Sequence, residues 1–212
     1  MPDWPCGAPG GPGTLPDLLG EDAARYDALV HPAARARFAA SRALLKYTVA
    51  AALGPAVPPH SVELGYRRGG RPFVRGPGGR YTVSLSHTEN ELLVGICERS
   101  ADAQVIGVDV ERADRELYGA GLARLMCTPG ELARLERTAP ASRNPLLVRW
   151  WTRKEAYSKA IGQGLGLRFT GFDADAPAHT GWLCRTFTLT GNPGAPTYTA
   201  AVAIGFDQEG TR

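Results

Sequence analysis

The spacing of apolar residues predicts a long helix in the first third of the chain. Pro32 suits a first helical turn, and Gly54-Pro55 forms a stop signal. Between them, apolar residues recur on one helical face: Ala34, Phe38, Leu45, Val49 and Leu53. We therefore expect a helix over residues 32–53. Its apolar face is bordered by Arg35, Arg42 and Lys46. These residues fit either basic side chains that reach past a core or an anion-binding edge.

Short runs with the composition of β-strands follow this helix. They are SVELGYRR, RPFV, YTVSLSH and LLVGICER, separated by the turn-forming segments RRGGRP, RGPGGR and TEN. We expect an antiparallel sheet that packs on the first helix.

A second round of helix and strand signals begins at Gln104. It comprises the strand QVIGVDVER, helices over residues 129–137 and 145–161, and strands FTGF, CRTFTLT and YTAAVAIGF. Asn144 before Pro145 reads as a helix cap, and Gly162 as a stop. The fold class is therefore α+β, with one half over residues 21–102 and another over residues 103–212. The Gly/Pro-rich residues 1–20 are expected to form a flexible lead-in.

Composition excludes some classes of partner and site. The 212 residues are 43% hydrophobic and 21% charged, as in a folded globular protein, and the net charge is only +3. Bulk charge therefore favours neither a nucleic acid nor a membrane partner. Cys6, Cys97, Cys127 and Cys184 lack metal-binding spacing, so we expect reduced thiols. No stretch approaches the roughly 20 apolar residues of a membrane span. The expectation is a cytoplasmic monomer.

Two carboxylates share one face of a predicted strand. In VIGVDVER, Asp109 and Glu111 alternate with valines, so both side chains project to the same side, about 7 Å apart. A hard divalent cation such as Mg²⁺ would neutralise their repulsion. A solvated strand face explains the same residues without a metal.

The helix that contains WTRKEAYSK raises a similar choice. Leu147, Trp151, Glu155 and Lys159 recur every four residues, so the stripe begins apolar and ends charged. On a solvent face, Glu155 and Lys159 would be a surface pair worth roughly 0.3 to 0.5 kcal/mol. In a cleft they would take part in the chemistry of a site.

Two further residues have both a functional and a structural interpretation. His87 follows the strand SLSH and precedes a turn, where ligands commonly meet a fold, although a lone histidine is more often structural. Glu131 fits a capping box with Thr128, and this pattern does not assign it to a metal.

Four motifs in order resemble the 4′-phosphopantetheinyl transferases, in particular the larger, two-halved type that serves peptide and polyketide synthases and so antibiotic biosynthesis. The motifs are Gly70-Arg71-Pro72, SLSH at residues 84–87, GVDVE at residues 107–111 and WTRKEAYSK at residues 151–159. The resemblance covers residues 37–166. It implies two similar α+β halves with coenzyme A and Mg²⁺ in the cleft between them.

The resemblance also implies an activity and residue roles. The phosphopantetheine arm of coenzyme A would be transferred to a serine of an apo acyl or peptidyl carrier protein, and adenosine 3′,5′-bisphosphate would be released. Asp109, Glu111 and Glu155 would hold Mg²⁺, Glu155 would be a base acting directly or through water, and Lys159 would contact the phosphates or protonate the leaving group. Arg37, Arg71, Ser86 and His87 would contact the nucleotide and its 3′-phosphate.

Two features depart from the family pattern, and one other class of function competes. The Gly/Pro-rich start replaces the strand with which relatives often open, and RADRELYG after Glu111 is compact, which leaves the choice of carrier open. The alternative is a protein of this fold that binds coenzyme A or a nucleotide without turnover. The combination of Asp109, Glu111, Glu155 and Lys159 favours the enzyme, because binding alone would not require all four.

Overall fold

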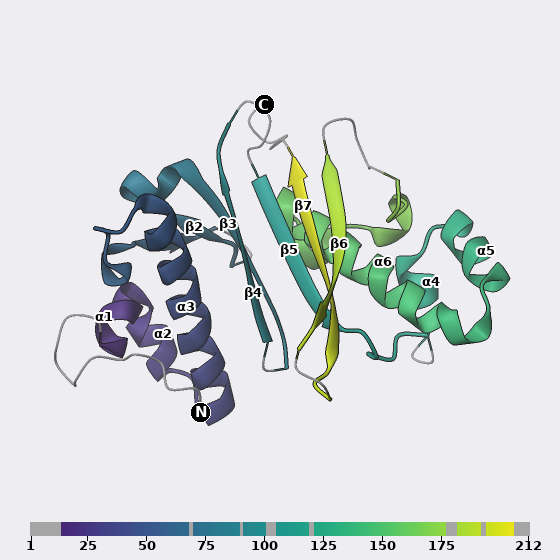
Figure 1. Cartoon of the computed structure of the whole chain (residues 1–212), viewed down its shortest axis with the longest axis horizontal. Coiled ribbons are helices and arrows are strands. Elements are labelled where there is room, and N and C mark those ends of the chain that lie inside the picture. The colour runs from purple at the N-terminus through teal and green to yellow at the C-terminus, as the bar shows by residue number, and fades with distance from the viewer. Residues whose placement is uncertain are drawn as a thin grey trace.

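The computed structural model describes residues 14–67, 70–89, 91–100, 105–118, 121–176, 182–191 and 194–205. Strands fill the middle of the molecule, with one group of helices to each side (Figure 1). Helix and strand together place the chain in the α+β class, as predicted.

The first half combines one long helix with two small sheets. Its helices are α1 (Leu15–Leu19), α2 (Ala23–Asp27) and α3 (Pro32–Leu53), and its strands are β1 (Leu64–Tyr66), β2 (Pro72–Val74), β3 (Tyr81–Thr88) and β4 (Glu91–Glu98). Both predicted ends of α3 are confirmed. Strands β1 and β2 pair antiparallel, as do β3 and β4. The core of this half lies between α3 and the sheets, around Leu45, Val49 and Val83.

The second half places a helix of the same length on a three-stranded sheet. Its elements are β5 (Val105–Arg112), α4 (Ala123–Met126), α5 (Pro129–Arg137), α6 (Pro140–Ile161), β6 (Leu183–Thr190) and β7 (Thr197–Gly205). The strand order is β5-β7-β6, antiparallel throughout, with Asp109 opposite Ala201. Small side chains on both elements, including Ala156, Ala160 and Ala203, allow α6 to approach the sheet closely.

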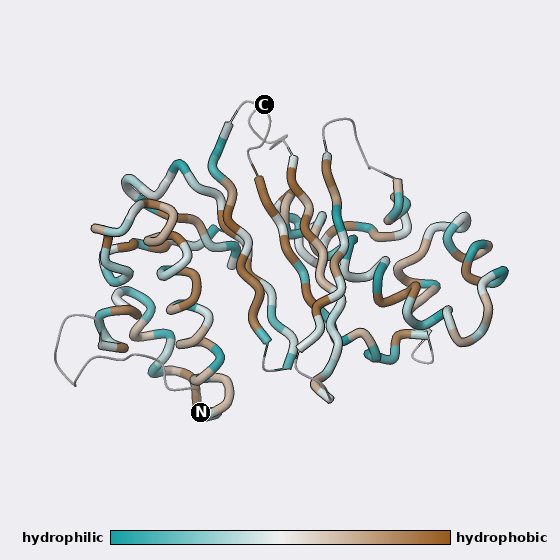
Figure 2. Tube along the Cα trace, viewed as in Figure 1, coloured by the Kyte–Doolittle hydropathy of each residue, from teal (hydrophilic) through white to brown (hydrophobic). Residues whose placement is uncertain are grey.

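Apolar side chains also line the boundary between the two halves. Figure 2 shows hydrophobic positions along β4 and β5. Gly95 on β4 is needed there, because a Cβ at that position would lie 2.5 Å from Val108 Cγ1 on β5. That each half combines a 22-residue helix with antiparallel strands agrees with the predicted layout. The internal similarity of the halves stays a prediction.

Three local expectations are wrong. Residues 14–19 do not form a flexible lead-in: α1 is capped by Thr14, whose N–H and hydroxyl both donate to Asp17, and Leu18 and Leu19 are buried. The predicted strand FTGF is a 3₁₀ turn, Phe169–Gly171, because the buried Phe169 serves the helical core. Helix α6 begins at Pro140 rather than Pro145, since Pro140 offers an equivalent first turn and Asn144 bonds elsewhere.

Some predictions fall outside the described residues. They concern residues 1–13, the joining segment 101–104 and Cys6. Residues 14–31 contain helices and no strand, which agrees with the expected lack of an opening strand over that range. None of the helices in the described ranges is long and apolar enough to cross a membrane.

Candidate active site

Strand β5 directs Asp109 and Glu111 toward helix α6. A Cβ at Gly107 would lie 1.9 Å from Ala156 O and 2.4 Å from Ala160 N, so only glycine allows the helix backbone to rest on the strand here. Because side chains alternate along a strand, the residues two and four positions later face the same helix. This contact explains the glycine of GVDVE physically and confirms that both carboxylates share a face.

Helix α6 brings Glu155 and Lys159 to those carboxylates. Along the predicted stripe, Leu147 (0%) and Glu155 (8%) are buried, whereas Trp151 is half-buried and the Lys159 side chain is 28% exposed. Lys159 Nζ lies 2.6 Å from Asp109 Oδ1. The interpretation as a solvent-exposed Glu155–Lys159 pair is therefore wrong, because Glu155 is buried and Lys159 pairs with β5.

Strand β3 contributes two serines that join the halves. The Ser86 hydroxyl donates to Asp109 Oδ1 at 2.7 Å and accepts from Lys159 Nζ at 2.8 Å and Val110 N at 3.4 Å. The Ser84 hydroxyl accepts from Val108 N at 3.0 Å. Ser86 is 4% exposed, so its hydroxyl positions Asp109 and Lys159.

Among the residues that the structure describes, two carboxylate oxygens at this junction are buried and find no hydrogen-bond partner. They are Asp109 Oδ2 and Glu155 Oε1. A buried unpaired acceptor costs roughly 1 to 3 kcal/mol, and more if it is charged. A fold retains such a cost where a ligand is to supply the missing partner.

Burial raises the pKa of two carboxyl groups of this site, and neighbouring negative charge adds to the shift. Burial raises the pKa of Glu155, and the charge of Asp109 adds to it, while Lys159 opposes the shift. Burial and Asp109 likewise raise the pKa of Glu111, opposed by Arg115. The junction thus concentrates more negative charge than its cations fully offset.

His87 and Arg37 flank the cationic side of the site. Burial lowers the pKa of His87, and the charges of Arg37 and Lys159 lower it further, so both cations lie within electrostatic reach of the imidazole. Arg37 is exposed on α3. The structure therefore gathers six predicted residues with Arg37: Ser86, His87, Asp109, Glu111, Glu155 and Lys159.

Arg71 lies beside the C-terminal end of α6. One of its guanidinium nitrogens is 3.1 Å from the position that a Cβ on Gly162 would take. Gly162 adopts the left-handed conformation, φ 78°, that ends the helix. Arg71 lines a small cavity with Arg67, Tyr81 and Arg99. Its predicted contact with the nucleotide stays a prediction.

A cleft opens beside the carboxylates on the side of Glu111. Its volume is about 560 Å³, and it is lined by His87, Thr88, Glu89, Glu111, Arg112, Asp114 and Arg115. The size suits a small-molecule substrate. Charged side chains dominate the lining, with three carboxylates and two arginines.

The carboxylates of this site are the type of oxygen donor that a hard cation prefers. In the described residues, however, no three His, Cys, Asp or Glu side chains are placed so that they could hold a metal ion. Lys159 and Arg115 instead pair with Asp109 and Glu111. The two unpartnered oxygens and the third carboxylate are the oxygen ligands that Mg²⁺ accepts, once either cation gives way.

Sequence reasoning missed the contacts of two side chains with Glu111. Trp151 Nε1 donates to Glu111 Oε1 at 3.0 Å, and Arg115 donates to the same oxygen. The Arg115 guanidinium also lies 5.4 Å from the Trp151 ring centroid. Trp151 could have been found, because it precedes Glu155 by one helical turn. Arg115 gave no such signal, since it lies in a turn without periodicity.

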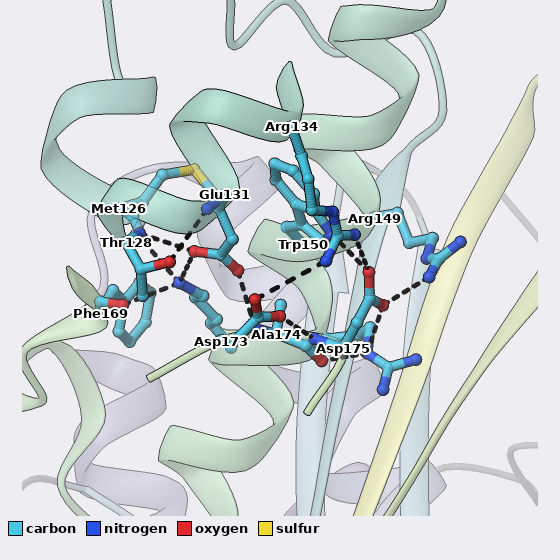
Figure 3. A network of polar contacts seen from close by, with 12 residues as sticks. Met126, Thr128, Glu131, Arg134, Arg149, Trp150, Phe169, Asp173, Ala174 and Asp175 are labelled. Carbon is cyan, nitrogen blue, oxygen red and sulfur yellow. Dashed lines mark hydrogen bonds and ion pairs between the residues drawn. The ribbon is translucent and has the colours of Figure 1, made fainter. Parts of the chain in front are cut away.

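Lys154 in the same motif belongs to a different network. Figure 3 shows its partners Met126, Glu131 and Phe169. Lys154 Nζ donates to Glu131 Oε2, Met126 O and Phe169 O at 2.6 to 2.8 Å. Glu131 also accepts from Thr128 N and Ala174 N, which confirms its predicted cap. Lys154 and Glu131 are completely buried, so this pair holds α5, α6 and the segment after α6 together.

Comparison with known proteins identifies similar sequences. Residues 105–203 match the sequence model of the 4′-phosphopantetheinyl transferase superfamily. The chain is 31% identical over 153 residues to the 4′-phosphopantetheinyl transferase HetI of Nostoc sp., covering 70% of this chain and 61% of that protein. It is 32% identical over 144 residues to a phosphopantetheinyl transferase of Thraustochytrium sp., covering 62% and 48%. A putative 4′-phosphopantetheinyl transferase of Synechocystis sp. is 28% identical over 155 residues, covering 73% and 61%. The chain thus spans about half to three fifths of these relatives.

Proposed function

We propose that this chain, whose residues 105–203 match the sequence model of the 4′-phosphopantetheinyl transferase superfamily, transfers the phosphopantetheine arm of coenzyme A to a serine of an apo carrier protein. The proposed reaction requires Mg²⁺ and releases adenosine 3′,5′-bisphosphate. The carrier is proposed to belong to a polyketide or peptide synthase. The names of the similar proteins support transfer of the phosphopantetheine group.

One observation carries the proposal. Asp109 Oδ2 and Glu155 Oε1 are buried without partners, next to an ammonium group and within the matched segment. Both oxygens lie at a junction of two halves that Ser86 holds together. A purely structural pair would satisfy these oxygens, as Glu131 is satisfied elsewhere on the same helix.

The carboxylates would hold the metal. Asp109, Glu111 and Glu155 would be its protein ligands, and bound Mg²⁺ would neutralise charge on the pyrophosphate of coenzyme A. Trp151 orients Glu111 through its indole N–H, and Ser86 orients Asp109. These bonds fix two ligands before substrate arrives and so reduce the reorganisation that the transition state requires.

Glu155 would accept the serine proton, and Lys159 would stabilise the leaving group. The carrier serine oxygen forms a bond to the β-phosphorus, while the bond from that phosphorus to the bridging oxygen breaks. The electron pair leaves with adenosine 3′,5′-bisphosphate, and the serine proton passes to Glu155, directly or through water. Lys159, held at Nζ by Asp109 and Ser86, would stabilise or protonate the departing phosphate oxygen.

The nucleotide of coenzyme A would be bound by the basic side of the site. His87 and Arg37 would contact the 3′-phosphate, and Arg71 the nucleotide. His87 lines the cleft directly. The predicted nucleotide contact of Ser86 would have to come in addition to the bonds that its hydroxyl already makes.

Intact-mass measurement tests the proposal. A panel of apo acyl and peptidyl carrier proteins is incubated with the protein, coenzyme A and Mg²⁺, and each carrier is expected to gain one phosphopantetheine if it is a substrate. Omission of Mg²⁺ should abolish the gain. Coenzyme A binding without mass gain on any carrier would contradict transfer and support the alternative, a coenzyme A or nucleotide binding protein without turnover.

A further inference from the structure

Arg115 is a cation of the cleft that lies outside all four motifs. Its side chain is 40% exposed, against 12% for Glu111, with which it pairs. The guanidinium contacts the Glu111 carboxylate and the indole of Trp151, and it lines the 560 Å³ cleft. Arg115 therefore sits at the boundary between the buried carboxylates and the space open to substrate.

Hydrogen bonds fix the backbone around Arg115, whereas its half-exposed side chain can change rotamer once its contact with Glu111 is broken. Asn144 Nδ2 donates to Arg115 O at 2.9 Å, and Asn144 Oδ1 accepts from Leu117 N and Tyr118 N at 2.8 and 3.0 Å. Arg115 N donates to Arg112 O at 3.1 Å. Movement of the guanidinium thus requires side-chain torsions only, which change within nanoseconds at an exposed position.

The charges of the site make Arg115 and a metal ion competitors. Three carboxylates, Asp109, Glu111 and Glu155, face two cations, Lys159 and Arg115. A divalent ion that takes Glu111 as a ligand competes with the guanidinium for that carboxylate. Lys159 differs, because Ser86 also holds it.

We propose that Arg115 is an exchangeable counter-ion: it neutralises Glu111 in the metal-free site, yields that carboxylate to the metal, and then binds a phosphate group of coenzyme A in the same cleft. This inference rests on the proposed function. A guanidinium suits both positions, because its planar set of donors matches carboxylate and phosphate alike. The exchange would couple metal binding to substrate binding.

The exchange predicts opposite changes in two affinities. In Arg115→Ala, Mg²⁺ no longer competes for Glu111, so its affinity without coenzyme A should rise about fivefold, the equivalent of about 1 kcal/mol for a half-exposed ion pair. Coenzyme A affinity at saturating Mg²⁺ should fall by a similar factor of about five, because a phosphate contact is lost. If Arg115 had only a structural role, its replacement would weaken both Mg²⁺ binding and coenzyme A binding.

Arg112→Ala is the matched control. Arg112 lines the same cleft but pairs with Asp114 and Glu89 rather than with Glu111. Its removal deletes the same charge without freeing a proposed metal ligand. Magnesium affinity should therefore change by less than about twofold.

The experiment titrates each full-length variant with MgCl₂ alone, and then with coenzyme A at saturating MgCl₂, by calorimetry and tryptophan fluorescence. Tighter Mg²⁺ and weaker coenzyme A binding in Arg115→Ala alone supports the exchange. Weaker Mg²⁺ binding, unchanged coenzyme A binding, or the same pattern in Arg112→Ala overturns it while leaving the proposed function intact. If the wild-type protein binds no Mg²⁺ under either condition, both the inference and the metal-dependent function fail. Arg115→Lys, which keeps the charge, should fall between wild type and alanine.

Discussion

Helix α6 carries two lysine–carboxylate pairs with the same separation and different surroundings. Lys154 Nζ and Glu131 Oε2 are 2.6 Å apart, as are Lys159 Nζ and Asp109 Oδ1. Both lysines come from WTRKEAYSK. Around Lys154, three acceptors take the three ammonium protons, and both partners are completely buried.

The second pair is incomplete by the same measure. Lys159 is 28% exposed and donates to Ser86 and Asp109, and Asp109 Oδ2 has no partner within the described part of the chain. Glu155, between the two lysines in sequence, also retains an unpartnered buried oxygen. Distance alone would rank the pairs as equal. The two pairs differ in how many of their donors and acceptors are hydrogen-bonded. The fully bonded pair of Lys154 and Glu131 stabilises the fold, whereas the pair of Lys159 and Asp109 can still bind a ligand.

The largest expected effect concerns stability at the saturated pair. Lys154→Met should lower the free energy of unfolding by about 3 to 5 kcal/mol, because it leaves the Glu131 charge buried and unpaired. Urea denaturation measures this loss. Lys159→Met should cost less than Lys154→Met, because Lys159 is partly solvated and the buried Asp109 keeps the Ser86 hydroxyl as a donor.

The double variant Glu131→Gln, Lys154→Met is the control for the first prediction. It removes both charges and should recover part of the loss. Similar losses for the two single lysine variants would break the distinction between the pairs.

The next effect concerns transfer at the incomplete pair. Glu155→Gln keeps the shape but removes the charge and the proton acceptor, so transfer should fall by at least about 10²-fold. The rate is followed by intact mass of the carrier. The metal-free melting temperature should stay close to wild type, and its rise on adding Mg²⁺ with coenzyme A should shrink.

Glu136→Gln is a matched control for that variant, because Glu136 is an exposed carboxylate on the neighbouring helix α5. It should transfer at the wild-type rate. If Glu155→Gln retained a rate within a few-fold of wild type, the proposed role of Glu155 would be excluded.

A third prediction concerns how the stability that Asp175 provides depends on pH. Burial alone would raise the pKa of Asp175, but hydrogen bonds from Trp150, Arg134 and Arg149 outweigh it and hold the pKa at about 2. Because the unfolded value is about 3.9, the group adds about 2 kcal/mol of stability above pH 4. That contribution is lost as the pH falls through 2.

Urea denaturation from pH 5 to pH 2 measures this contribution. Wild type should lose about 2 kcal/mol more than Asp175→Asn over that range, because only the wild type has the low-pKa carboxylate to protonate. Parallel pH curves would show that the arginines do not hold this charge.

The smallest effects distinguish two serines on β3. Ser84→Ala and Ser86→Ala each leave a β5 N–H without its hydroxyl acceptor and should each cost about 1 kcal/mol of stability. Only Ser86 also contacts Asp109 and Lys159. Transfer should therefore fall about tenfold in Ser86→Ala, consistent with loss of a charged hydrogen bond, and should stay unchanged in Ser84→Ala. Equal rates in the two variants would remove Ser86 from the site.

Local sequence patterns correctly predicted the elements that depend on residues close together in the sequence. The apolar period and the Gly54 stop define α3, and the strand alternation places Asp109 and Glu111 on one face. Thr128 and Glu131 form the predicted cap because its donors and acceptors lie within four residues. Such features depend on neighbours in sequence, so they can be read without the fold.

Features that depend on distant partners were missed. Asn144 resembled a helix cap, yet its side chain binds the backbone of residues 115–118 across the fold. Arg115 and Trp151 meet at Glu111 although they lie 36 residues apart in the printed sequence. No periodicity encodes such a meeting, because it follows from how α6 docks on β5.

The sequence by itself determined which carboxylates share a strand face and which charged residues follow one another on a helix, because alternation and helical pitch are local properties. Only the tertiary structure decided that Lys154 is saturated and Lys159 is not. Two side chains five positions apart on a helix, such as Lys154 and Lys159, point in directions that differ by about 140°. Which direction meets α5 and the Phe169 carbonyl, and which meets Asp109, depends on the packing of elements distant in the chain.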